Sequence, residues 1–185
     1  ILDYAAEYQV GAGMGAWRVS TEYSSDTAFD QNIVWETIQN PFCLYADPSA
    51  KDKEKRDAAD WILTEKIAKA EYEKSYPDAQ IVDFEDHEFD DEDEWETDEE
   101  VRIAEYWYKE PIKKEIWKLS DGTVIDSEED EAAIILRDFP QEIQERRVVD
   151  THKIMMVICS GNAILEGPTE FPGTNFPFVQ VYGEY

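Results

Sequence analysis

The chain has 185 residues, the length of one ordinary domain, and 42% of them are hydrophobic, enough for a packed core. Forty-four acidic residues against 17 basic ones give a formal net charge of −27. A surface this negative repels nucleic acid and anionic membranes, and no run of about 18 apolar residues is available to span a bilayer.

The N-terminal segment raises the question of a nucleotide site. Gly11, Gly13 and Ala16 fit the G-x-G-x-x-G/A spacing of a dinucleotide-binding turn. Residues 1–8 read as the end of a helix, however, and residues 16–23 alternate as a half-buried strand does. A dinucleotide turn requires the opposite order, with the strand first and the helix N-terminus at the pyrophosphate. The segment therefore does not predict a nucleotide site.

The same glycines predict a tight junction between a helix and a strand. We expect Gly11 to end the helix in the left-handed region, and Gly13 and Gly15 to allow close backbone approach. The alternation places Trp17 on the buried face of the strand, where it would contribute about 2–3 kcal/mol. Arg18 lies on the opposite face, where we expect it to meet a carboxylate.

The rest of the chain predicts short strands joined by tight turns. Asp121-Gly122 is the strongest hairpin signal, and Ser127 is expected to cap a helix over residues 127–139. The fold class is therefore α+β, a single domain over residues 1–185 with mostly antiparallel sheet, long hairpins and a few short helices. Strands are predicted at residues 31–39, 60–67, 101–110, 113–120, 145–160, 163–167 and 176–184, a short helix at 68–76, and an extended crossing loop at 40–50.

Residues 83–100 form an acid run with 13 acidic residues and no Lys or Arg. We expect a solvated, flexible insertion; a surface that collects cations or repels DNA is the functional alternative. No glycine stands at the middle of a D-x-D-x-D pattern, so a calcium loop is not indicated.

Signatures of catalysis are missing from the sequence. It contains no G-x-S-x-G, H-E-x-x-H, C-x-x-C or G-K-[ST] motif. His87 and His152 read as structural or exposed, and two cysteines, Cys43 and Cys159, read as buried thiols in a reducing compartment. We expect the one small basic cluster to pair with neighbouring acids rather than with phosphate. We therefore predict no catalytic, cofactor-binding or metal-binding residue. The cluster consists of Arg146, Arg147 and Lys153.

Five stretches in a fixed order carry a resemblance to a known family. The first contains Gly-x-Gly-Ala-Trp-Arg at residues 13–18, and the second contains Asn-Pro-Phe and Tyr-x-Asp-Pro-x-Ala. Together they resemble the portal (head-to-tail connector) proteins of short-tailed phages, in particular the large portal type of the Salmonella podoviruses. The acid run is not part of the resemblance. The stretches are residues 11–23, 40–52 with 57–67, 72–79, 103–111 and 146–185.

The resemblance implies a structural, non-catalytic role. Portal proteins of this type form a twelve-subunit ring at one capsid vertex, through which double-stranded DNA is packaged and ejected without specific binding. The implied partners are further copies of the chain, capsid and scaffolding proteins, and, through other regions of the protein, the terminase and tail adaptors; no membrane is involved. The implied location is the virion, and the host cytoplasm during assembly. Because residue 1 is isoleucine and the last residues read as a strand, we expect an excised piece of the wing region.

Two other function classes stay open on the sequence alone. The acid run would suit a free-standing acidic binding module, such as a DNA mimic that occupies basic clefts. Abundant carboxylates would also allow a hydrolase with a catalytic carboxylate pair, although in so acidic a chain such a pair can always be proposed.

Overall fold

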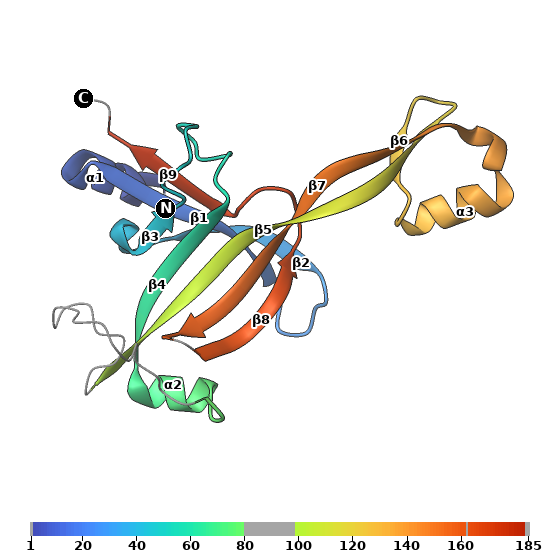
Figure 1. Cartoon of the computed structure of the whole chain (residues 1–185). Coiled ribbons are helices and arrows are strands. Elements are labelled where there is room, and N and C mark those ends of the chain that lie inside the picture. The colour runs from blue at the N-terminus through green and yellow to red at the C-terminus, as the bar shows by residue number, and fades with distance from the viewer. Residues whose placement is uncertain (1, 80–98, 162, 184–185) are drawn as a thin grey trace. The chain divides into compact units, whose positions relative to one another are not determined.

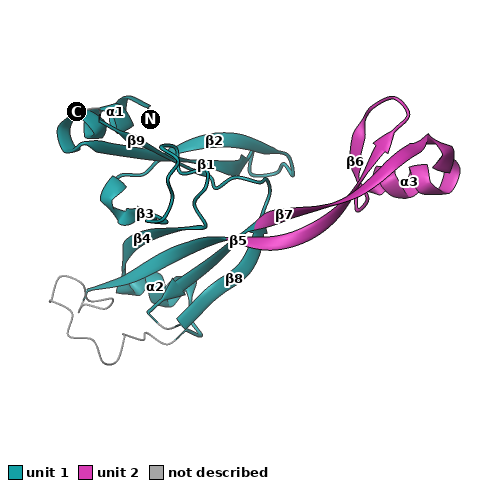
Figure 2. Ribbon diagram, turned by 45° about the horizontal axis from the view of Figure 1, so that its top comes forward, with its two compact units in different colours: residues 1–108, 154–185 teal, residues 109–153 magenta. Residues whose placement is uncertain are grey.

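The computed structural model describes residues 2–79, 99–161 and 163–183. It confirms the α+β class, with antiparallel sheets and three α-helices in these residues. The chain divides into two compact units, one of residues 1–108 with 154–185 and one of residues 109–153 (Figure 2). Of the acid run, residues 83–98 lie outside the described part. No described helix is both long and apolar enough to cross a membrane.

The first unit contains a three-stranded antiparallel sheet in the order β2–β1–β9 (Figure 1). The register places Trp17 of the central strand opposite Thr37 on one side and Val179 on the other. This sheet therefore joins segments from the two ends of the chain. Its elements are α1 (Leu2–Ala12), β1 (Met14–Tyr23), β2 (Gln31–Thr37) and β9 (Phe178–Tyr182).

A second antiparallel sheet runs in the order β3–β4–β5–β7–β8. Strands β7 and β8 form the predicted long hairpin, with register shifts on either side of Ile158. The predicted crossing loop at 40–50 instead contains a 3₁₀ turn and a short strand, because the Asn40 side chain caps the turn at the Phe42 N–H (3.1 Å). The elements are η1 (Pro41–Cys43), β3 (Leu44–Ala46), β4 (Asp60–Ala68), α2 (Lys69–Ser75), β5 (Glu100–Leu119), β7 (Ile143–Ser160) and β8 (Ala163–Phe171).

Strand β5 is continuous where the sequence predicts two strands, at 101–110 and 113–120. Pro111, which has no backbone N–H, lies in the gap between the two predicted strands. The strand continues through Pro111 because the φ of proline is compatible with extended backbone. Strand β5 supplies residues to both units, as does β7.

The core of the first unit lies between its two sheets. Trp107 of β5 meets Phe171 and Phe178 edge-on, with ring centroids 5.2 and 5.5 Å apart, and Trp61 lies 5.6 Å from Phe178. Edge-to-face packing is one of the two arrangements that aromatic rings favour, beside offset stacking. The buried members are Ala16, Ile38, Leu44, Ala58, Trp61, Trp107, Ile154 and Phe178.

The second unit has a small core around Trp117 of β5. The predicted hairpin at Gly122 is confirmed: its φ is +88° and the following strand β6 (Val124–Asp126) pairs with β5. Helix α3 (Asp130–Asp138) begins later than predicted, because the Ser127 N–H donates to the Glu115 carbonyl (2.9 Å) and extends the hairpin instead of capping the helix. The unit also contains η2 (Pro140–Glu142), and its buried apolar residues are Trp117, Leu119, Ile125 and Ala132.

Candidate functional site

The glycine segment joins α1 to β1, in the helix-then-strand order that the sequence predicts. Gly13 takes the left-handed conformation, with φ at +84°, and its N–H donates to the Gln9 carbonyl (3.1 Å). Gly11 lies inside α1, so its prediction as the left-handed cap is wrong. Ala12 continues the helix for one more residue, and the left-handed conformation is needed only at Gly13, where the chain turns toward β1.

At Gly15 the backbone of α1 lies directly against β1. A Cβ atom on Gly15 would lie 2.0 Å from the Ala5 carbonyl oxygen, and both residues are buried. The Gly183 N–H, just past β9, donates to the Gly13 carbonyl at 2.9 Å, and the Gln9 side chain donates to the Tyr182 carbonyl at 2.7 Å. The segment thus connects α1, β1 and β9.

Trp17 is half-buried, not buried as predicted. The buried neighbour is Ala16, which belongs to the core with Phe178. Strand β1 therefore turns its even-numbered side chains toward the second sheet, and Trp17 lies on the other face of the strand. The sequence did not indicate which face of the strand is buried, because the buried residue, Ala16, has only a small side chain.

Arg18 meets two carboxylates, one on each sheet of the first unit. Its Nε lies 2.6 Å from Glu36 Oε2 on β2, and its Nη1 lies 3.0 Å from Glu105 Oε1 on β5. The other Glu105 oxygen accepts from the indole N–H of Trp107 at 3.0 Å. The sequence predicted a carboxylate partner for Arg18, but Glu105 stands 87 positions away and had no local signal.

These two ion pairs favour the charged forms of Arg18 and Glu36. Burial opposes the charge on Arg18, yet the charge of Glu105 and the hydrogen bond to Glu36 outweigh it and raise the pKa of Arg18. Burial likewise opposes the charge on Glu36, but the hydrogen bond and charge of Arg18 lower the pKa of Glu36. Arg18 is therefore a cation already neutralised by the protein.

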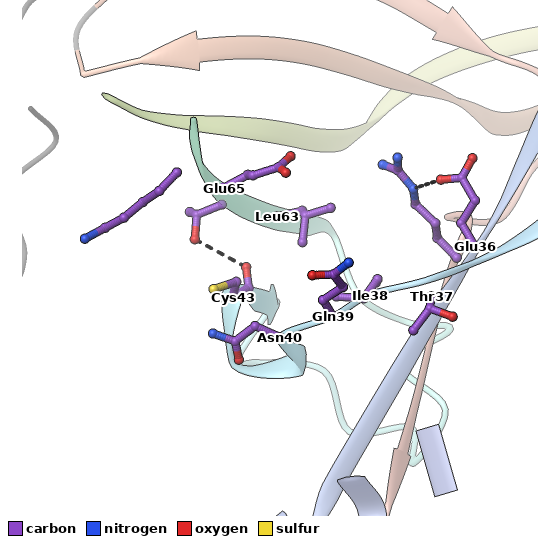
Figure 3. Close-up of a pocket in the computed structure, with 11 residues that line it drawn as sticks. Glu36, Thr37, Ile38, Gln39, Asn40, Cys43, Leu63 and Glu65 are labelled. Carbon is purple, nitrogen blue, oxygen red and sulfur yellow. Dashed lines mark hydrogen bonds and ion pairs between the residues drawn. The ribbon is translucent and has the colours of Figure 1, made fainter. Parts of the chain in front are cut away.

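A pocket of about 510 Å³ opens beside Arg18 and Glu36 (Figure 3). Its other walls come from the segment that follows β2 and from β4. Thr64 on one wall donates to the Cys43 carbonyl on another (3.5 Å). The lining contains the Arg18–Glu36 ion pair, two side-chain amides and the Cys43 thiol. The lining residues are Arg18, Glu36, Thr37, Ile38, Gln39, Asn40, Cys43, Leu63, Thr64, Glu65 and Lys66.

Other candidate side chains are dispersed. Cys43 and Cys159 are free and half-buried rather than buried, and burial raises the pKa of the Cys159 thiol. His152 is half-buried on β7, whereas His87 lies outside the described residues. Within residues 2–79, 99–161 and 163–183, no three His, Cys, Asp or Glu side chains group closely enough to hold a metal ion.

The two arginines of the small basic cluster do not share a face of the sheet. Arg146 and Arg147 are neighbours in β7, so their side chains leave the strand on opposite faces. The Arg146 guanidinium lies 4.9 Å from the centre of the Trp117 ring, a cation–π contact rather than the predicted pairing with an acid. Arg147 shares its face with Glu145, two residues away, which partly offsets its charge.

The whole length of the chain matches one known protein family. The family model of the phage P22-like portal proteins covers residues 1–185. This match agrees with the resemblance seen in the five sequence stretches. The chain belongs to the phage P22-like portal protein family.

Proposed function

We propose that this chain is a non-catalytic part of a portal ring at a capsid vertex, past which double-stranded DNA moves during packaging and ejection. A structural role in a phage portal follows from the family. The proposal that DNA moves past the chain without being bound rests on charge. The chain carries −27 on 185 residues, and Arg18, the cation of the glycine segment, is held between two carboxylates.

The negative charge of the chain determines how its surface interacts with DNA. Duplex phosphates are repelled by a carboxylate-rich protein, and at about 0.15 M salt the repulsion extends only about 8 Å. It prevents the duplex from settling on the protein and is too short-ranged to propel it. Arg146 and Arg147, on opposite faces of β7, offer no joint phosphate clamp.

The remaining parts of the proposal come from the family. We propose a ring of twelve copies and a place for this chain in the outer wing region. Capsid and scaffolding proteins would contact the ring, and the terminase and tail adaptors would bind other regions of the protein. The helix-to-strand junction of Gly11, Gly13, Gly15, Trp17 and Arg18 would keep the two sheets of the first unit fixed during assembly.

Electron microscopy and native mass spectrometry of a complete portal protein that contains this chain test the ring. We expect closed rings, with a subunit number that does not change with salt. Monomers under every salt condition would contradict the proposal. The 185-residue chain alone is expected to stay mostly monomeric at low salt, because −27 per copy opposes close packing.

A second candidate function is an acidic binding module or DNA mimic, favoured by the 13 acidic residues in positions 83–100. It predicts that the chain retains a DNA-binding protein in a pull-down and loses it when residues 83–100 are deleted. The ring proposal predicts that the deletion leaves ring assembly intact.

A further inference from the structure

The sheet β2–β1–β9 has an apolar face that carries exposed side chains. On it Ile33 is 75% exposed, Trp35 is 50% exposed and Tyr23 is 61% exposed. The register places Thr21 opposite Ile33 and Val19 opposite Trp35, so these side chains share one face. Large apolar side chains grouped on an exposed sheet face mark an interaction surface.

Strand β2 is also an edge of that sheet. The Ser24 N–H donates to the Asp30 carbonyl (2.9 Å) at the end of the β1–β2 hairpin. Hydrogen-bonded pairs alternate along an antiparallel ladder, so Val34 directs its N–H and C=O toward β1. Ile33 and Trp35 therefore direct their N–H and C=O groups outward, to the side where a further strand would add.

This edge lacks several of the usual protections against strand addition. Native edge strands are blunted by charged residues, especially Lys, by Pro, by a bulge, by a very short length or by a covering helix or loop. The one charged residue of β2, Glu36, is paired with Arg18. Residues 31–37 contain neither Lys nor Pro, and they pair with residues 17–23 without a register shift. A regular seven-residue edge that carries Ile33 and Trp35 is a template for a partner strand.

The negative charge around the β2 edge favours a positively charged partner. From Val19 to Ala50 the chain has five acidic residues and no Lys or Arg. Glu22, Asp26 and Asp30 are exposed, at the hairpin end and on the face opposite Ile33. A second copy, at −27, would bring more negative charge to this place, whereas Lys or Arg in the partner would be attracted to it.

We propose that the β2 edge binds an extended segment of a partner protein as an added strand. The segment has apolar side chains at alternate positions, beside Ile33 and Trp35, and Lys or Arg at the positions between them. Main-chain hydrogen bonds to the outward groups of β2 give the affinity, and the alternation gives the specificity. The proposal does not depend on the number of subunits in the ring.

Residue-resolved amide exchange of the whole 185-residue chain tests this directly. The probe is a peptide of about seven residues, a common strand length, that alternates lysine with valine or isoleucine. We expect it to slow exchange of the Ile33 and Trp35 amides at least about tenfold, because they gain acceptors. The Val34 amide, already bonded to β1, should exchange slowly with or without peptide. A control peptide has the same composition with its lysines in one block.

Two substitutions at one position separate strand addition from simple charge attraction. Ile33→Thr removes the apolar side chain and keeps the outward N–H; Ile33→Pro removes both, and neither disturbs the ladder to β1. We expect the dissociation constant of the alternating peptide to be at least about tenfold weaker for I33P than for I33T. If I33P does not fold, the exchange measurement on the unaltered chain decides.

Two results would overturn the proposal. The first is that both peptides bind with equal affinity and neither slows amide exchange at Ile33 and Trp35. This would mean that the acidic surface merely attracts lysine. Protection of the same amides without peptide, rising with protein concentration together with dimer in sedimentation, would show that a second copy occupies the edge.

Discussion

A Cβ atom on Gly15 would lie 2.0 Å from the carbonyl oxygen of Ala5, well inside the contact distance of the two atoms. Helix α1 therefore lies against β1 at a separation that only glycine permits. The sequence predicted close backbone approach at this position, and the structure identifies Ala5 as the residue approached. The junction of α1 and β1 depends on this one missing methyl group.

Gly15→Ala should lower the free energy of unfolding by about 3 kcal/mol, since the helix must move away from the strand to admit the methyl group. Gly11→Ala is the matched control. Gly11 lies inside α1, and a Cβ atom on it would have no atom within 4 Å apart from its chain neighbours and the backbone of its own helix, so the same change should raise stability by roughly 0.5 kcal/mol. Urea unfolding of both variants measures the difference; equal effects would contradict this description of the junction.

Gly13 tests backbone conformation rather than space, since no atom beyond its chain neighbours lies within 4 Å of its Cβ position and its φ is +84°. Gly13→Ala should cost about 1 kcal/mol, because the left-handed region is unfavourable for a residue with a Cβ. Gly13→Asn should cost less, since asparagine tolerates that region better. A thermal melt of the two variants gives the order, which would be reversed if side-chain crowding mattered instead.

The ion pair between Arg18 and Glu105 links β1 to β5 and should be measurable in a double-mutant cycle. With Arg18→Met and Glu105→Gln we expect a coupling free energy of about 1 kcal/mol, because both side chains are partly exposed. The coupling should fall in about 1 M salt, where screening reaches 3 Å. An additive cycle at low salt would show that the pair does not stabilise the contact between the sheets.

Asp47 gives a prediction about pH. It is 8% exposed, and its carboxylate accepts from the backbone N–H groups of Ala59 (3.0 Å) and Ser49 (2.7 Å). The Ala59 N–H, followed by Ser49, lowers the pKa of Asp47. A lowered folded-state pKa adds stability that is complete above the unfolded-state value of about 3.9 and is lost as the pH falls through the folded-state value.

The comparison for Asp47 is the variant Asp47→Asn, which has the same shape and no charge. Its melting temperature should lie below that of the unaltered chain at neutral pH, and the gap should close as the pH falls below about 4. A gap that stayed constant down to acid unfolding would show that the charge of Asp47 contributes nothing.

The sequence predicted most elements of the fold because their signals are local. Period-two alternation located β1, and the Asp-Gly pair at 121–122 located the β5–β6 hairpin. Local signals failed at Ser127, a good helix cap in isolation, whose N–H is held by Glu115 across the hairpin. The continuity of β5 was not predicted either, because Pro111 falls between its two predicted strands and pairing across a sheet is not a local signal.

The candidate site was less predictable because its contacts are long-range. Alternation showed that Trp17 and Arg18 lie on opposite faces of β1 but not which face meets the second sheet; that depends on Ala16 packing with Phe178. Glu105 as partner of Arg18, and the pocket beside them, arise only when β1 and β5 come together. The exposed edge of β2 follows from strand order, which alternation alone does not contain.

A titration of labelled double-stranded DNA with the folded chain, read by fluorescence anisotropy at about 0.15 M salt, tests the central claim most directly. We predict no binding up to about 100 μM chain, weaker than the roughly 10⁻⁴–10⁻⁶ M of ordinary non-specific DNA binding. Micromolar binding that weakens with salt, and is lost with Arg146→Ala and Arg147→Ala, would contradict the claim that DNA moves past this protein without being held.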